Sequence, residues 1–101
     1  MDNIAATPIT VRVRENANYM DDRAAYTIGP YASYAEAEAV CRKMVDDFLA
    51  GNAKPGLNAT DLFGLYTTFG EDPSVVGGVS TEAAFSAWDY AKRRCGEMCR
   101  G

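Results

Sequence analysis

The chain has 101 residues, of which 48% are apolar and 24% are charged, and its formal net charge is −4. This length suits a single domain with one hydrophobic core, and the composition excludes extensive disorder. The acidic balance argues against nucleic acids and anionic membranes as the main partners. No apolar run approaches the roughly 20 residues that span a bilayer, and residues 1–20 lack signal-peptide order, so we expect a cytoplasmic protein.

The chain contains three cysteines and no histidine. An odd number of cysteines fits free thiols in a reducing compartment better than a disulfide framework. Without histidine, the commonest general base and the commonest nitrogen ligand of zinc are both missing. Cys41, Cys95 and Cys99 lie on apolar helical stripes, where we expect them to be buried in the core. The sequence therefore predicts neither a metal site nor a cofactor, and it favours a non-enzymatic role.

Residues 1–7 have no hydrophobic period and are predicted to be a loose lead-in to a single domain spanning residues 8–101. From Pro8 the chain alternates strictly, which predicts a half-buried strand. Its two faces carry Ile9, Val11 and Val13 on one side and Thr10, Arg12 and Arg14 on the other. Residues 15–22 are rich in turn formers, alternation resumes over residues 24–28, and Gly29-Pro30 is predicted to stop a second strand. We expect an antiparallel hairpin.

A long helix is predicted to follow the hairpin. Ser33 and Glu36 have the spacing of a capping box, in which the serine caps the helix and the glutamate reaches back to the amide of the cap. The helix is predicted to end near Gly51-Asn52. Its apolar stripe consists of Ala37, Val40, Cys41, Met44, Val45 and Phe48.

A shorter helix is predicted to begin at Asn58 or Thr60 and to end at Gly70. The density of its large apolar residues predicts burial on more than one side; these residues are Leu62, Phe63, Leu65, Tyr66 and Phe69. Residues 71 and 72 precede a proline and are predicted to form a constrained loop, followed by a short third strand over residues 74–76.

Residues 80–101 are predicted to form one long amphipathic helix, capped by Ser80 or Thr81. Its apolar face contains Ala84, Phe85, Trp88, Ala91, Cys95, Met98 and Cys99. Full burial of Phe85 and Trp88 would contribute roughly 2–3 kcal/mol each, so we expect this face to anchor the core.

The predicted element order is β-β-α-α-β-α. A small antiparallel sheet with the helices packed on one face is the simplest way to bury the apolar faces of these elements. The sequence therefore predicts the α+β class.

Residues 26–44, YTIGPYASYAEAEAVCRKM, resemble the strand–Gly–Pro–aromatic–Ser–x–x–Glu–Ala–helix unit of SPOR domains. This resemblance implies a small α+β module that binds the glycan strands of peptidoglycan. The segments FGEDP (residues 69–73) and FSAWDYAKRRC (residues 85–95) are together similar to short uncharacterised bacterial proteins. That similarity implies a small bacterial family without an assigned activity.

The leading functional hypothesis is a small domain that binds another protein or associates with itself. It follows from a sequence with no histidine, no phosphate-binding loop and no cluster of metal ligands. The candidate interface is the polar face of the first strand, with Thr10, Arg12 and Arg14, together with Tyr19 in the following turn. An unpaired strand edge would offer a second contact surface.

An alternative hypothesis is a small enzyme or ligand-binding domain that uses Glu71 and Asp72. Adjacent carboxylates support acid/base chemistry when their surroundings separate their pKa values. Tyr66 and Arg23 are the residues expected beside them. This hypothesis predicts a concave pocket that contains a carboxyl with a shifted pKa. Glycan binding of the SPOR kind is the third hypothesis.

Overall fold

The computed structural model describes residues 8–18, 25–77 and 85–99, which form an α+β fold with the predicted order β-β-α-α-β-α. Its elements are β1 (Ile9–Glu15), the 3-10 turn η1 (Asn16–Asn18), β2 (Tyr26–Tyr31), α1 (Tyr34–Asn52), α2 (Ala59–Phe69), β3 (Glu71–Val76) and α3 (Ala87–Met98). The predicted lead-in over residues 1–7 and residues 19–22 of the predicted hairpin turn lie outside the described residues.

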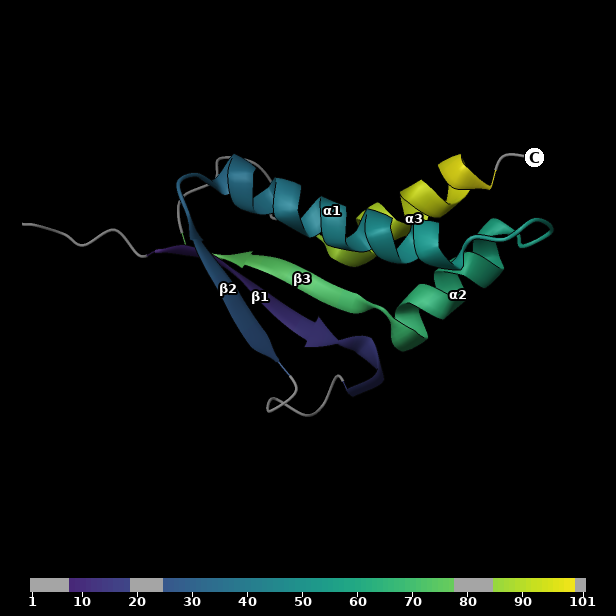
Figure 1. The fold of residues 1–101 in the computed structure, drawn as a ribbon, viewed down its shortest axis with the longest axis horizontal. Helices are drawn as coiled ribbons and strands as arrows, with labels where there is room; N and C mark the ends of the chain where they lie inside the picture. Colours follow the sequence, from purple (N-terminus) through teal and green to yellow (C-terminus); the bar gives the residue numbers. More distant parts are fainter. Residues whose placement is uncertain (1–7, 19–24, 78–84, 100–101) are drawn as a thin grey trace, which may run out of the picture.

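The three strands form an antiparallel sheet in the order β2-β1-β3, and helices pack on one of its faces, as predicted. Helices α1 and α3 cover this face, and α2 lies at the end of the sheet (Figure 1). In the central strand, Val11 pairs with Ile28 of β2 and with Val75 of β3. Val11 and Val13 are fully buried on the face that the helices cover. Since successive side chains of a strand point to opposite faces, the polar residues of β1 lie on the other face. The alternation predicted for β1 is confirmed.

The second strand does not stop at Gly29-Pro30, as the sequence predicted, but continues to Tyr31. The pairing between β1 and β2 shifts at this point, so an irregularity in the ladder accommodates the two residues. Gly29 has a φ of +117°, a conformation that residues with a side chain rarely adopt. Because β2 is an edge strand, the missing N–H of Pro30 is tolerated there.

Helix α1 connects the two parts of the core. Its predicted cap is confirmed, because the Oγ of Ser33 accepts a hydrogen bond from the backbone N–H of Glu36 at 3.1 Å. The fully buried residues of α1 step by four along the helix: Ala37 and Cys41 pack on the sheet, and Val45 and Leu49 pack on α2 and α3. The predicted stripe members Val40, Met44 and Phe48 are only half-buried, because they flank this line of contact.

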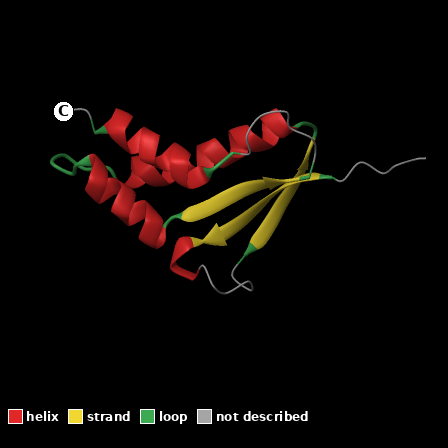
Figure 2. Cartoon of the chain, turned by 180° about the vertical axis from the view of Figure 1, so that it is seen from behind, coloured by secondary structure: helices red, strands yellow, loops and turns green. Residues whose placement is uncertain are grey.

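Helix α2 is buried on one side rather than on several. It starts after Asn58, whose side-chain oxygen accepts a hydrogen bond from the backbone N–H of Asp61. Leu62 and Tyr66 are fully buried, whereas the side chain of Phe69 is 67% exposed. The helix lies at one end of the molecule, where α1 and α3 pack against its buried side and η1 contacts its carboxyl end (Figure 2). The predicted burial on more than one side is therefore wrong.

The third strand begins at Glu71 and not at residue 74, so the predicted loop over Glu71 and Asp72 is part of β3. Pro73 lies inside this strand with its ring fully buried, opposite Val13 of β1. Because β3 is an edge of the described sheet, the absent N–H of the proline does not interrupt a second ladder. The pairing places Glu71 and Asp72 opposite Glu15 and Arg14 of β1.

Helix α3 begins at Ala87, where Ser86 caps it and accepts a hydrogen bond from the backbone N–H of Asp89. The predicted caps at Ser80 and Thr81 lie outside the described residues, but residues 85 and 86 precede the helix, so one continuous helix from residue 80 is wrong. The buried residues step by four: Ala87, Ala91 and Cys95. Trp88 is one residue away from this line, about 100° around the helix, and its side chain is 39% exposed. The predicted burial of Trp88 is therefore wrong.

Candidate functional site: the cavity between β3 and α3

A cavity of about 600 Å³ lies between β3 and the start of α3. Its lining comes from η1, α2, β3 and α3, which are far apart in the sequence; the residues are Asn16, Thr67, Asp72, Pro73, Ser74, Phe85, Ser86, Ala87 and Trp88. This volume is within the usual range for a binding pocket, about 300–1,000 Å³. We name it the β3–α3 cavity.

Trp88 forms a fixed aromatic wall of the β3–α3 cavity. Its indole Nε1 donates a hydrogen bond to the Oδ1 of Asn16 at 3.2 Å. The ring of Phe63 in α2 packs against the indole edge to face, with 6.3 Å between the centroids and an angle of 89° between the planes. The indole is thus oriented by a hydrogen bond and a ring contact, although Trp88 as a residue is 39% exposed.

Asn16 joins η1 to the end of α2. Its side-chain amide donates a hydrogen bond to the carbonyl of Tyr66 at 2.8 Å, and its backbone N–H donates to the carbonyl of Gly70 at 3.0 Å. The carbonyl of Tyr66 also accepts a hydrogen bond from the backbone N–H of Gly70 at 2.8 Å, so the Asn16 amide is its second partner. Gly70 is required for this approach, because a Cβ there would lie 2.6 Å from Cδ1 of Tyr66 and 2.8 Å from its carbonyl oxygen. Two hydrogen bonds to main-chain carbonyls therefore fix Asn16, whose side chain in turn orients Trp88.

Asp72 is the acidic residue of the lining, and it is half-buried. Burial raises the pKa of its carboxyl above the ordinary value, and the neighbouring Arg14 opposes part of this rise. Burial is the larger of the two effects, so the charged carboxylate remains incompletely stabilised by its surroundings. A positive group that enters the cavity would stabilise it further.

The structure places Tyr66 beside Glu71, as predicted, but neither residue is among those that line the β3–α3 cavity. Tyr66 is fully buried, and its hydroxyl donates a hydrogen bond to the backbone carbonyl of Glu71 at 2.6 Å. The carboxylate of Glu71 accepts a hydrogen bond from the hydroxyl of Tyr26 at 2.7 Å, and burial and this bond raise the pKa of Tyr26 to about 12. Burial also raises the pKa of Tyr66 well above its ordinary value. Of the four predicted residues, Asp72 lines the cavity and Arg23 lies outside the described residues.

The predicted interface residues lie on the open face of the sheet. Thr10 pairs with Val76, and Arg12 pairs with Ser74, on the face opposite the helices. Arg14 occupies the same face beside Asp72. Tyr19, the fourth predicted residue, lies outside the part of the chain that the structure describes.

The strand edges are poor templates for pairing with another chain. Each edge strand of the described sheet contains a proline, Pro30 in β2 and Pro73 in β3, and proline on an edge discourages strand addition. The carbonyl of Glu71 is already bound by the hydroxyl of Tyr66.

Several residues of the cavity were not predicted as functional from the sequence. The sequence places Asn16 in a stretch of turn formers, and it predicts that Phe85 and Trp88 belong to the core. The four-residue step of Ala87, Ala91 and Cys95 is the signal that places Trp88 off the buried line.

The described residues contain no group of three or more potential ligand side chains that could hold a metal ion. Cys41 and Cys95 are buried free thiols and Cys99 is half-buried; burial raises the pKa of Cys41 to about 11.

No helix among residues 8–18, 25–77 and 85–99 has the length and apolar character to cross a bilayer. Comparison with protein-family models, with curated proteins and with solved structures gives no match.

Proposed function

We propose that this protein is a binding module that recognises a polypeptide partner, and that a basic side chain of the partner enters the β3–α3 cavity between Trp88 and Asp72. The observation that carries this proposal is the partly exposed indole of Trp88, which is held in place beside the cavity by Asn16 and Phe63.

Trp88 has the properties of an interface anchor. Tryptophan is enriched among the few residues that contribute most of the free energy of protein association. An indole that is already oriented in the free protein loses little conformational freedom on binding. Its face also attracts a cationic group, by about 0.5–2 kcal/mol depending on exposure.

Asp72 is the only charged residue among the described residues of the lining, which favours a basic ligand group, and the neighbouring Arg14 of β1 offsets part of this preference. Asp72 contributes a carboxylate whose charged form is destabilised by burial, and the chain as a whole has a net charge of −4. A lysine or arginine side chain would neutralise Asp72 with its charged end, and its apolar stem would contact Phe85 and Trp88. Charge complementarity of this kind steers association and selects among partners.

The shape of the surface favours a polypeptide over a compact small molecule. A second cavity, of about 230 Å³, shares Phe85 and Ser86 with the β3–α3 cavity. The two cavities therefore adjoin at Phe85 and Ser86, just before α3, and we call them together the α3 tract. An extended segment of several residues would occupy this tract more completely than a single small ligand.

The proposal is tested with three small probes: the methylamides of Nα-acetyl-lysine, Nα-acetyl-arginine and Nα-acetyl-norleucine, the last being the uncharged counterpart of lysine. Trp88 is the sole tryptophan of the chain, so its fluorescence reports binding without a label. We expect saturable changes with the two basic probes and not with norleucine. The variant Asp72→Asn should weaken this binding by about threefold to tenfold, in the range of a partly exposed ion pair with an added cation–π contact.

Asp47→Asn provides the matched control. Asp47 is an exposed carboxylate of α1 that bonds Lys43, so its substitution makes the same change of net charge away from the cavity. Equal binding of the norleucine and lysine probes would refute the proposal. The same conclusion would follow if Asp72→Asn and Asp47→Asn had the same effect.

The half-buried carboxyl of Asp72 in a cavity also supports a second candidate function, the binding of a small cationic molecule. Choline and putrescine test it in the same fluorescence assay. Binding of either compound at least about tenfold tighter than lysine-containing peptides would favour this second candidate, since a polypeptide site gains affinity from contacts along the segment.

A further inference from the structure

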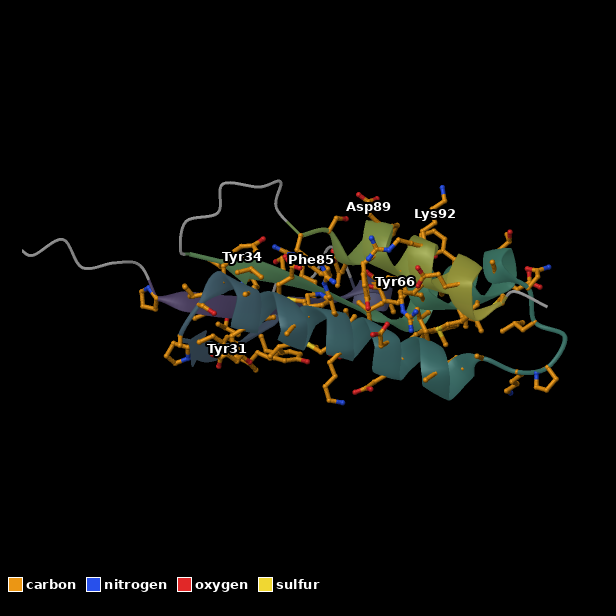
Figure 3. The ribbon with its side chains drawn as sticks, turned by 90° about the horizontal axis from the view of Figure 1, so that it is seen from above. Tyr31, Tyr34, Tyr66, Phe85, Asp89 and Lys92 are labelled. Atoms are coloured by element: carbon orange, nitrogen blue, oxygen red, sulfur yellow. The ribbon has the colours of Figure 1, made fainter. Side chains whose placement is uncertain are left out.

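The second cavity lies next to the β3–α3 cavity and is lined mainly by charged and aromatic residues: Arg42, Phe85, Ser86, Asp89, Tyr90 and Arg93. The position of the shared residue Phe85 is fixed by its backbone N–H, which donates a hydrogen bond to the hydroxyl of Tyr34 at 3.0 Å. Figure 3 shows Tyr34 and Phe85 close together where the first turn of α1 meets the start of α3. We name this second space the α1–α3 cavity.

Two arginines from different helices contact the same ring in the α1–α3 cavity. The Cζ of Arg42 in α1 lies 5.4 Å from the centroid of Tyr90, and the Cζ of Arg93 in α3 lies 5.3 Å from it. The hydroxyl of Tyr90 donates a hydrogen bond to Asp46 at 2.8 Å, and Asp46 also accepts one from Arg94 at 2.9 Å. The ring is thus fixed at its hydroxyl end, and both guanidinium groups contact it and line the same cavity.

The two guanidinium groups differ in whether an acidic side chain among the described residues neutralises their charge. Arg42 pairs with Glu38 one turn earlier in α1. Arg93 makes no ion pair within the described part of the chain, and its ring contact with Tyr90 leaves its nitrogen donors available. Asp89 also lines the cavity, but it points away from α1 (Figure 3). The planar fork of a guanidinium group suits an oxyanion such as a carboxylate or a phosphoryl group.

We propose that the α1–α3 cavity binds a carboxylate or phosphoryl group of the same polypeptide segment whose basic side chain occupies the β3–α3 cavity. The identity of the ligand as a polypeptide rests on the proposed function above. Arg93 and Arg42 bind the oxyanion, and Asp72 and Trp88 bind the cation. The partner segment therefore carries a basic and an acidic group at nearby positions, and the two charges set its direction along the start of α3.

The test uses short peptides with a lysine and a second, variable residue separated by about one to four glycines, since an extended chain advances about 3.3 Å per residue. The variable residue is glutamate, phosphoserine or the uncharged glutamine. Trp88 fluorescence measures affinity, and the ¹⁵N signals of the arginine side chains report on the α1–α3 cavity. For at least one spacing we expect the glutamate or phosphoserine peptide to bind about threefold to tenfold tighter than its glutamine counterpart.

Arg93→Glu should abolish the advantage of the acidic peptides. Lys92→Glu is the matched control, because Lys92 makes the same charge change in the same helix, lines neither cavity and points away from α1 (Figure 3). The outcome separates the two proposals. If lysine peptides bind but glutamate and phosphoserine add nothing at any spacing, this inference is overturned and the proposed function stands. If inorganic phosphate shifts the Arg93 signal in the parent protein while lysine probes do not bind, the oxyanion site is supported and the proposed function fails.

Discussion

The substitution Asn16→Ala should destabilise the protein and release Trp88 at the same time. It removes the half-buried hydrogen bond to the carbonyl of Tyr66, at 2.8 Å, and the more exposed bond from the indole, at 3.2 Å. A typical net value is about 1 kcal/mol for the first bond and about half of that for the second. The carbonyl of Tyr66 keeps its bond from the backbone N–H of Gly70, so we expect a total of about 1.5 kcal/mol. For a domain of this size the midpoint of thermal unfolding should fall by about 6–12 °C.

Thermal unfolding followed by circular dichroism measures the loss of stability, and the fluorescence of Trp88 measures the loss of its hydrogen bond. In Asn16→Ala the indole gains freedom and exposure, so its emission should shift to longer wavelength. Asn16→Asp separates the two bonds, because a carboxylate still accepts from the indole but cannot donate to the carbonyl of Tyr66. It also places a negative charge near the negative end of the α2 dipole. We therefore expect Asn16→Asp to lose stability while keeping the emission of the parent protein.

Asn52→Ala is the control, since the amide of Asn52 donates to the carbonyl of Phe48 at 2.8 Å and lies away from the cavity. It should lose about 1 kcal/mol and leave the emission of Trp88 unchanged. The proposed role of Asn16 would be refuted if Asn16→Ala lost no more stability than Asn52→Ala and left the emission where it is in the parent protein.

Three further predictions concern backbone space, proton binding and thiol reactivity. Gly70→Ala should lower the free energy of unfolding in urea by about 1–3 kcal/mol, because the added Cβ would overlap the buried ring of Tyr66. Gly64→Ala is the control: an added Cβ there has no atom within 4 Å, so this variant should gain about 0.5–1 kcal/mol. Equal effects of the two substitutions would contradict the packing around Gly70. Burial raises the pKa of Asp72 in the native state above its value in the unfolded chain. Between these two pKa values the unfolded chain releases the proton more readily than the native state does, so the free energy of unfolding falls as the pH rises through this range. Asparagine does not titrate, so the stability of Asp72→Asn relative to the parent protein should increase as the pH rises from about 4 towards neutrality. Urea unfolding at several pH values measures this difference, and a difference that decreases over the same range would argue against a raised pKa. Iodoacetamide should label Cys99 before Cys41 in the native protein, because the Cys41 thiol is buried and its pKa is raised to about 11; mass spectrometry showing the opposite order would disprove it.

The elements that were predicted correctly depend on interactions between residues close in the chain. The strict alternation from Ile9 to Val13 reports the half-buried environment of β1 directly. The caps at Ser33 and Asn58 each bond an amide three residues further on, so their geometry is contained in a few successive residues. The order of elements followed from these local signals, and so did the α+β class.

The start of α3 shows where local signals become ambiguous. Ser80, Thr81 and Ser86 are all acceptable caps by residue type, and the structure uses Ser86. The choice depends on Phe85, which packs against both halves of the core and whose N–H is bound by the hydroxyl of Tyr34, 51 residues earlier in the chain. No pattern within residues 80–101 contains that contact.

The β3–α3 cavity shows the same division. The sequence by itself determined that Asp72 is a carboxyl next to a proline and that Trp88 is the single tryptophan of an amphipathic helix. Only the tertiary structure decided that the two line one cavity. The indole of Trp88 is oriented by Asn16, 72 residues away, and Asp72 is extended in β3 because that strand pairs with β1. Local patterns express propensity and period, whereas a cavity consists of the space left between segments that meet only after the chain has folded.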